Sequence, residues 1–459
     1  MHGIPVLVKD NVATRDRTNT TAGSFALLGA RVGDDSGVVA RLRDGGAVVL
    51  GKTNMGSWDG TRTQAAPGSW SARGGLAVGA YFDGQDPLGA SSGSAVAASL
   101  GLAWAALATE TTSALLGPAH VANCVGIKPT VGLTSRHLVI PVSRRQDSVG
   151  PIARTVRDAA HLLAAIAGPD PRDNYTSAIP FSAPRDYVAA CRPDGLRGRR
   201  IGVVRNIRDI ERVEEPSTTP SLAAFDRSLE VLRAAGAEVV DNITLPSLVE
   251  YRKFPYQIVT LTADLRDHLG KHYLELLEEN PANVTSLDDL RRFVKSSGLE
   301  SSDEYDTYLW DLALEFAPEQ GSADYWGNYT VAHDLVGTQG ITGALERYSL
   351  DAIAMPPMYA GLTAGLLGLP AVTVPLGKTP DDSPRVASLS PGPLSASGPN
   401  QPFGIAFVGP AFAEESLISI AYAFEQRTQV RGTVRPHVQP KTELEAIVRK
   451  RLAGASGFP

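Results

Sequence analysis

Several kinds of strong chemical signal are scarce in this sequence. Only two cysteines, Cys124 and Cys191, occur in 459 residues, so a disulfide framework is excluded. Two free buried thiols fit the pattern at least as well as a single bridge. No run is apolar enough to span a bilayer, since the best candidate, 93–109, is rich in Ala, Gly and Ser. A net charge of −6 argues against a partner that is a nucleic acid or a membrane surface.

Side chains that bind metals or cofactors are also poorly arranged. The eight histidines are scattered; His268 and His272 are four residues apart, but no acidic residue lies between them as a hydrolytic zinc site would require. Residues 46–53 match the phosphate-loop pattern GxxxxGK[ST], yet a helix is expected before them and a strand within them, the reverse of a phosphate loop. We therefore expect no metal and no cofactor.

One stretch rich in small residues, 88–130, stands out, with an uncharged Ala-rich segment at its centre. Two hydroxyl-rich loops, 89–94 and 109–113, flank an Ala-rich segment, 95–108, whose composition predicts a buried helix. Small residues allow close approach of backbone or ligand. The pattern predicts that both loops lie at the ends of one rigid element and form a site.

Apolar strands and amphipathic helices alternate along much of the chain. We expect strands at 4–8, 47–50, 125–130, 200–204, 238–240, 351–356, 369–376 and 403–408, and helices at 37–44, 155–167, 220–236 and 414–428. Residues 250–345 are mainly helical by the same criteria, with Trp310 and Trp326 as packing anchors. The alternation predicts an α/β fold with a mostly parallel sheet covered on both faces.

Lys9 is the most reactive candidate outside the two loops. It ends an apolar strand, where burial would lower the pKa of its ammonium group. A lysine of this kind can act as a general base for a serine without any histidine. On this residue alone, a solvated lysine at the end of a strand explains the pattern equally well.

Seven runs of sequence come in the order and spacing of the amidase signature family. They are 3–11 (GIPVLVKDN), 51–55 (GKTNM), 91–97 (SSGSAVA), 125–135 (VGIKPTVGLTS), 147–151 (DSVGP), 371–377 (AVTVPLG) and 403–409 (FGIAFVG), and run 421–426 (AYAFEQ) resembles the closing helix of fungal members. The match covers most of 1–170 and 345–430 and is weak over 180–345. The chain is identified as a member of this family on these motifs.

The resemblance implies one α/β domain over 1–459, built on a mixed, twisted sheet of about eleven strands with helices on both faces. Its core is 1–170 and 345–430, and the variable, mainly helical region 180–345 shapes the substrate side. It also implies hydrolysis of a carboxamide through an acyl-serine. The bond that is broken is a C–N bond other than a peptide bond. The family machinery is a lysine, a bridging serine on a cis peptide and a nucleophilic serine, and Lys9 falls on the lysine.

Alanine occupies both serine positions in this alignment. The bridging serine falls on Ala90 and the nucleophile on Ala114, and the family's oxyanion turn falls on Thr111, Thr112, Ser113 and Ala114. A methyl group can neither attack a carbonyl nor relay a proton. We interpret the chain as an amidase-family protein whose acyl-transfer site is degenerate, a pseudoenzyme kept for binding a small-molecule amide or related ligand, or for a tailoring step in secondary metabolism.

Two alternatives remain open. A shifted triad, Lys9–Ser91–Ser113, would give an active serine amidase, and an inactive remnant without a function is the other reading. Neither the substrate nor the oligomeric state follows from the sequence.

Five of the eleven asparagines lie in N-x-Thr sequons: Asn19, Asn174, Asn242, Asn283 and Asn328. Chance would give roughly one or two, so the pattern suggests a secreted glycoprotein. Met1 opens directly on the lysine strand, without a signal peptide or the helical segment that family members place there. A truncated gene model and a natural truncation would both explain this start. If the sequons reflect secretion, we expect that the natural N-terminus lies upstream of Met1.

Overall fold

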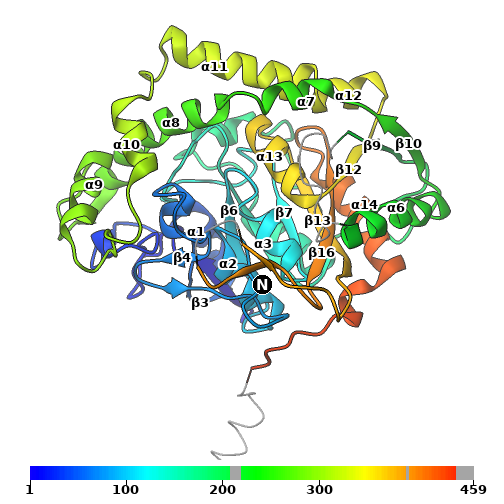
Figure 1. The fold of residues 1–459 in the computed structure, drawn as a ribbon, viewed down its shortest axis with the longest axis horizontal. Helices are drawn as coiled ribbons and strands as arrows, with labels where there is room; N and C mark the ends of the chain where they lie inside the picture. Colours follow the sequence, from blue (N-terminus) through cyan, green and yellow to red (C-terminus); the bar gives the residue numbers. More distant parts are fainter. Residues whose placement is uncertain (207–218, 389–391, 441–459) are drawn as a thin grey trace, which may run out of the picture.

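A computed structural model describes residues 1–206, 219–388 and 392–440 (Figure 1). Its centre is a ten-stranded sheet in the order β10-β9-β12-β16-β13-β7-β8-β6-β1-β3. The strands are β1 (Pro5–Lys9), β3 (Val48–Thr53), β6 (Ala105–Glu110), β7 (Val125–Lys128), β8 (Ser148–Ala153), β9 (Arg200–Val204), β10 (Glu238–Ile243), β12 (Ala352–Met355), β13 (Ala371–Lys378) and β16 (Pro402–Val408). The expected α/β fold around a large mixed sheet is confirmed.

The sheet is mixed rather than mostly parallel. β1 pairs in parallel with β3 and β6, and β9 with β10 and β12, whereas the pairs β6–β8, β7–β8, β7–β13, β13–β16 and β12–β16 are antiparallel. The mostly parallel sheet that the alternation of helices and strands predicted is therefore wrong. The family resemblance implied the mixed sheet correctly.

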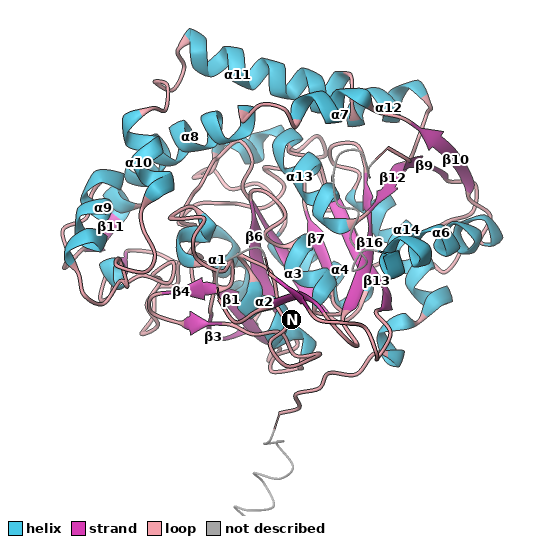
Figure 2. Cartoon of the chain, in the orientation of Figure 1, coloured by secondary structure: helices cyan, strands magenta, loops and turns pink. Residues whose placement is uncertain are grey.

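Helices cover both faces of this sheet (Figure 2). One core cluster joins the sheet to α1 (Gly37–Asp44), α4 (Val156–Ile166), α6 (Thr219–Ala234) and α14 (Glu414–Thr428). The other joins it to α2 (Ser92–Ser99), α3 (Leu116–Val121), α7 (Pro246–Tyr251), α12 (Ile341–Arg347) and α13 (Pro357–Leu367). Neighbouring residues of one strand contribute to opposite clusters, as Leu107 and Ala108 do, because side chains of a strand alternate between faces.

The predicted helix over 95–108 is wrong. α2 ends at Ser99, and Gly101 follows in the left-handed region at φ +69°. A residue in that conformation ends a helix, and glycine adopts it without a steric penalty. The second half of the segment, Ala105–Glu110, is the fully buried strand β6. A short apolar run between two polar loops fits a buried strand as well as a buried helix, and periodicity cannot separate them.

The region between β10 and β12 is mainly helical, as expected, and its helices lie across the top and down the left side of the molecule in Figure 1. Besides α7 and α12 it contains α8 (Tyr256–His272), α9 (Leu287–Ser296), α10 (Tyr308–Glu315) and α11 (Ala323–His333). Trp310 is fully buried against Trp58, with ring centroids 5.9 Å apart, and is the expected packing anchor. Trp326 is 41% exposed, and its ring packs against Tyr325 and Tyr329 at the surface.

The remaining paired strands form three small sheets: β2 (Arg31–Val32) with β11 (Leu277–Glu279), β4 (Trp70–Ser71) with β5 (Gly75–Leu76), and β14 (Val386–Ala387) with β15 (Ser395–Ser397). Both cysteines are free and buried. In the described ranges no helix is long and apolar enough to cross a membrane.

Candidate active site

The two small-residue loops meet directly. The backbone N–H of Ser91 donates to the carbonyl oxygen of Ala114 at 3.0 Å, which brings positions 90 and 114 side by side. Ala90 and Ala114 both line a cavity of about 320 Å³, and the Gly89–Ala90 peptide bond is cis. The methyl groups of Ala90 and Ala114 therefore lie close together at one cavity.

The neighbouring serines lie elsewhere. Ser91, which precedes α2, donates its hydroxyl to the carbonyl oxygen of Thr109 at 3.1 Å and is fully buried. Ser113, at φ +57°, donates its hydroxyl to the carbonyl oxygen of Met358 at 2.6 Å. Neither serine is among the residues that line the cavity. Each hydroxyl proton is held by a backbone carbonyl outside it.

Lys9, at the end of β1, is fully buried. Its Nζ lies 2.5 Å from Oδ1 of Asp59 and donates to Oγ1 of Thr109 at 2.7 Å. Burial lowers the pKa of the Lys9 ammonium, and the negative charge of Asp59 opposes that effect. The core-facing position that the sequence suggested for Lys9 is therefore the one it has.

Asp59 was missed by the sequence analysis, although it lines the cavity beside Ala90. It lies in a short turn, η2 (Ser57–Gly60), in which Trp58 and Asp59 both have positive φ, +51° and +59°. Aspartate is among the few residues that tolerate this region. Its spacing from Lys9, 50 residues along the chain, gives no local pattern from which the pair could be predicted.

The turn 111–114 presents backbone donors at the cavity. Thr111, Thr112 and Ala114 line it, and within the described part of the chain the N–H groups of residues 112–114 have no hydrogen-bond acceptor. Consecutive free N–H groups at a cavity form a site for a carbonyl oxygen or an oxyanion. The backbone of the turn thus retains donor capacity although the side chain at 114 is a methyl group.

Five hydrogen bonds hold this turn in place. The Thr111 hydroxyl donates to Asp147 at 2.6 Å, and Glu110 accepts from the N–H groups of Leu115 and Leu116, each at 2.7 Å. The bonds from Ser91 to Ala114 and from Ser113 to Met358 add two more. Burial raises the pKa of Asp147 to about 7. The hydrogen bonds that its carboxylate accepts, chiefly from Thr111, oppose this effect and lower the pKa.

Helix α13 packs against the turn through glycines. A Cβ atom at Gly361 would lie 2.5 Å from Cα of Ser113, and one at Gly365 would lie 2.3 Å from the carbonyl oxygen of Thr111. Only a residue without a side chain permits this approach. The turn is therefore fixed from the loop side and from the helix side.

The cavity walls are mainly apolar and come from loops and from the helical region. Val142, Ile258, Leu261, Leu265 and Leu309 form them, so α8 and α10 complete the site. Thr61, Gln64 and Thr262 add uncharged polar groups. Of the described lining residues only Asp59 is charged, and Lys9 neutralises it, so the cavity suits an uncharged ligand with an apolar body.

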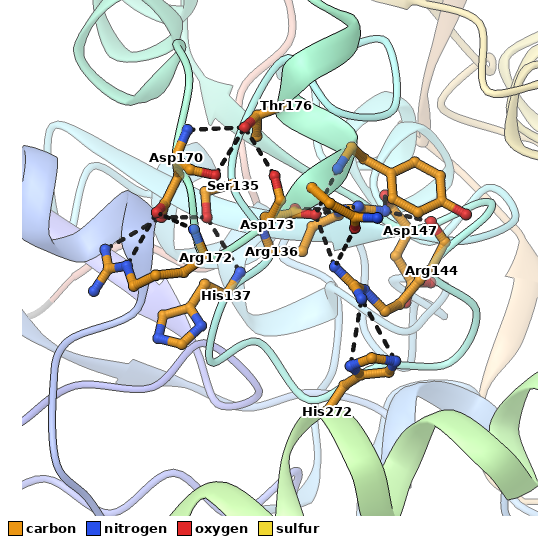
Figure 3. Close-up of polar contacts among 12 residues, drawn as sticks. Ser135, Arg136, His137, Arg144, Asp147, Asp170, Arg172, Asp173, Thr176 and His272 are labelled. Carbon is orange, nitrogen blue, oxygen red and sulfur yellow. Dashed lines mark hydrogen bonds and ion pairs between the residues drawn. The ribbon is translucent and has the colours of Figure 1, made fainter.

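Figure 3 shows a polar network that includes Arg136, Arg144 and Asp173. Arg136 donates to both oxygens of Asp173, from Nε at 2.8 Å and from NH2 at 2.7 Å, and Arg144 donates to the same carboxylate at 2.9 Å. Burial alone would raise the pKa of Asp173, but the bonds and charge of Arg136 bring it to about 2. The network fixes the loop whose Val142 and Ser143 N–H groups bind Asp147.

The histidine pair belongs to this network rather than to a metal site. Arg144 contacts the ring of His272 at 3.3 Å, and His268 is buried, accepting from the Arg144 N–H at 3.2 Å. Burial and the neighbouring arginines lower the pKa of both rings to about 4. Among the described residues no group of three or more His, Cys, Asp and Glu side chains could hold a metal ion.

The five sequons differ in exposure. Asn174, Asn242 and Asn283 are exposed, whereas Asn19 and Asn328 are partly buried. Asn19 also accepts the N–H of Gly29 at 3.1 Å, and the threonine of its sequon, Thr21, is fully buried and bonded to Asp10.

Comparison with known proteins identifies the family and the fold. The family model named Amidase matches residues 1–418. A putative amidase of Arthroderma benhamiae is 42% identical over 98% of this chain and 74% of its own length. The crystal structure of peptide amidase from Stenotrophomonas maltophilia superposes with a TM-score of 0.81 at 35% identity, covering 95% of this chain and 85% of that one. The same enzyme has been crystallised with the competitive inhibitor chymostatin, and that structure gives a TM-score of 0.80 at 35% identity over 95% and 84% of the two chains.

The chain therefore belongs to the amidase signature family, as its motifs indicated. Its relatives by fold include enzymes that act on amides.

Proposed function

We propose that this protein binds a small, uncharged, largely apolar molecule that carries a carbonyl group, and that it does not form an acyl-serine. The proposal rests on the two alanines that line the cavity, at the positions that the family resemblance assigns to the reacting serines, and on the backbone donors beside them. Ala90 and Ala114 line the cavity, next to the free N–H groups of residues 112–114. The cavity lacks a serine nucleophile, but its N–H donors can bind the oxygen of a carbonyl group.

The alternative, an active amidase that uses Lys9, Ser91 and Ser113, is less well supported. A serine nucleophile must reach the carbonyl carbon within about 3–3.5 Å, and its proton must pass to the base. The Ser113 hydroxyl instead donates to Met358, and its Cα touches Gly361 of α13. Turning this side chain into the cavity would require the turn to leave its contacts with α13.

Binding is tested by calorimetry with three probes of similar shape: phenylacetamide, phenethylamine and phenylacetate. We expect phenylacetamide to bind most tightly, because it brings a carbonyl without a net charge into a cavity where Asp59, the one charged residue among the described lining residues, is already paired with Lys9. Ile258→Trp should weaken binding, because this half-exposed wall residue lies at the cavity and a larger ring would fill it without disturbing the core.

The control is Ala323→Val, an exposed change at the start of α11, which should leave binding unchanged. Binding of none of the three probes, or equal binding to the protein and to Ile258→Trp, would contradict the proposal. Release of phenylacetic acid from phenylacetamide by the unaltered chain would support the active-amidase alternative instead.

A further inference from the structure

Asp59 is the acidic residue among the described residues that line the cavity, and its carboxylate is almost completely paired. Oδ1 contacts Nζ of Lys9 at 2.5 Å, while Oδ2 accepts from Oγ1 of Thr109 at 3.0 Å and from Nδ2 of Asn11 at 3.2 Å. Its side chain is only 7% exposed. The carboxylate therefore serves the protein interior rather than a ligand.

Lys9 is equally well satisfied in return. An ammonium group has three hydrogens and no acceptor. Those of Lys9 face Asp59 at 2.5 Å, Oγ1 of Thr109 at 2.7 Å and, more weakly, the Thr109 carbonyl oxygen at 3.5 Å. None of these contacts is with residue 90, the position of the bridging serine in the family. Asp59 and Thr109 hold the Lys9 ammonium instead.

The turn that carries Asp59 is itself anchored. Both Trp58 and Asp59 have positive φ, a region that non-glycine residues seldom occupy unless their surroundings hold them there. The N–H of Trp58 donates to Ala22 at 3.0 Å and that of Asp59 to Gly56 at 2.9 Å. The carboxylate is therefore held at Lys9 by the backbone.

From these contacts we propose that Asp59 is a positioning residue that keeps Lys9 as a fully paired ammonium ion, so that the loss of amide hydrolysis depends on positions 59, 90 and 114 together. The inference rests on the proposed function. It predicts that restoring the two serines alone will not restore the reaction.

The chemistry explains why the third position matters. A serine introduced at 114 would form a bond to the amide carbon while its proton passes through the hydroxyl introduced at 90 to the Lys9 amine. The C–N bond then breaks and the leaving amine takes that proton from Lys9. An ammonium ion has no lone pair to accept the proton, and the negative charge of Asp59 stabilises that ion.

The experiment compares phenylacetamide hydrolysis, measured as ammonia release, in Ala90→Ser/Ala114→Ser and in the same double variant with Asp59→Ala or Asp59→Asn added. We expect both triple variants to exceed the double variant by about 100-fold, the lower range for a proton-transfer catalyst. The increase of their rates with rising pH should also begin at a lower pH than in the double variant. Without the negative charge of Asp59, Lys9 loses its proton more easily. A matched control adds Asp267→Ala, a carboxylate on α8 paired with Arg266, and should give no gain.

Equal rates in the double and triple variants would overturn the inference, as would an equal gain from Asp267→Ala. Folding and probe binding are checked for each variant by melting temperature and calorimetry. A second measurement needs no restored activity: acetic anhydride labelling of Lys9, read by mass spectrometry, should start at lower pH in Asp59→Asn than in the unaltered protein. An unchanged labelling profile would also overturn the inference, while leaving the proposed binding function intact.

Discussion

Gly361 offers the sharpest test of how the donor turn is held. Replacing it with alanine would place a Cβ atom 2.5 Å from Cα of Ser113 and 2.5 Å from its Oγ. Carbon atoms in favourable contact lie about 3.5–4.0 Å apart, so the turn and the helix must separate by about 1 Å. The displaced turn would lose the bond between Ser113 and Met358, and its N–H groups would move relative to the cavity.

The magnitude follows from two opposing effects. Overpacking of a rigid contact costs about 1–3 kcal/mol, and the clash with backbone places this case near the upper end. Alanine is better than glycine in a helix by about 1 kcal/mol. We expect Gly361→Ala to lower the free energy of unfolding by about 1–2 kcal/mol and to weaken phenylacetamide binding several-fold.

The matched control is Gly327→Ala in α11, where an added Cβ meets no atom within 4 Å. It keeps the propensity gain without the clash, so the free energy of unfolding should rise by up to about 1 kcal/mol. The assay is urea unfolding together with calorimetry on both variants. Equal stability and equal binding in Gly361→Ala and Gly327→Ala would refute the account of the turn.

Two further predictions concern pH and modification. The folded pKa of Asp173, about 2, lies below its ordinary value of 3.8, so its contribution is present above pH 4 and is lost as the pH falls toward 2. The shift corresponds to about 2 kcal/mol, and the difference in urea midpoint between the protein and Asp173→Asn should narrow between pH 7 and pH 2.5. Burial raises the pKa of Asp147 to about 7, so its effect on stability has the opposite sign. The free energy that its ionisation costs the folded state grows between pH 4 and pH 7. Expressed through a secretory pathway, the chain should carry N-glycans at the three exposed sequons and none at Asn19; peptide mass spectrometry with and without glycosidase tests this, and a glycan at Asn19 would contradict it.

Much of the fold could be predicted from the sequence because its elements are strongly patterned. The closing helix α14 was predicted at 414–428 and has those bounds, Glu414–Thr428. Segment 95–108 failed for a local reason, since an Ala-rich run carries almost no periodic signal and the glycine at 101 decided where α2 ended. Strand direction also depends on long-range pairing, such as that of β13 with β16, and local alternation does not determine it.

The site was predictable only where the motifs are contiguous. Positions 90 and 114 and the turn 111–114 followed from short runs, and the structure places 90 and 114 side by side. Asp59 could not be found in this way, because its role depends on a contact with Lys9 across 50 residues. The apolar walls from α8 and α10 lie in the part of the chain where the family motifs are weakest.

The most direct test of the central claim is the intact mass of the unaltered protein after incubation with a fluorophosphonate, a reagent that labels activated serines. Because the Ser91 and Ser113 hydroxyls donate to backbone carbonyls outside the cavity and both cavity positions are alanine, we predict no added mass. A stoichiometric adduct mapped to Ser113 would contradict the account and identify the protein as an active serine amidase.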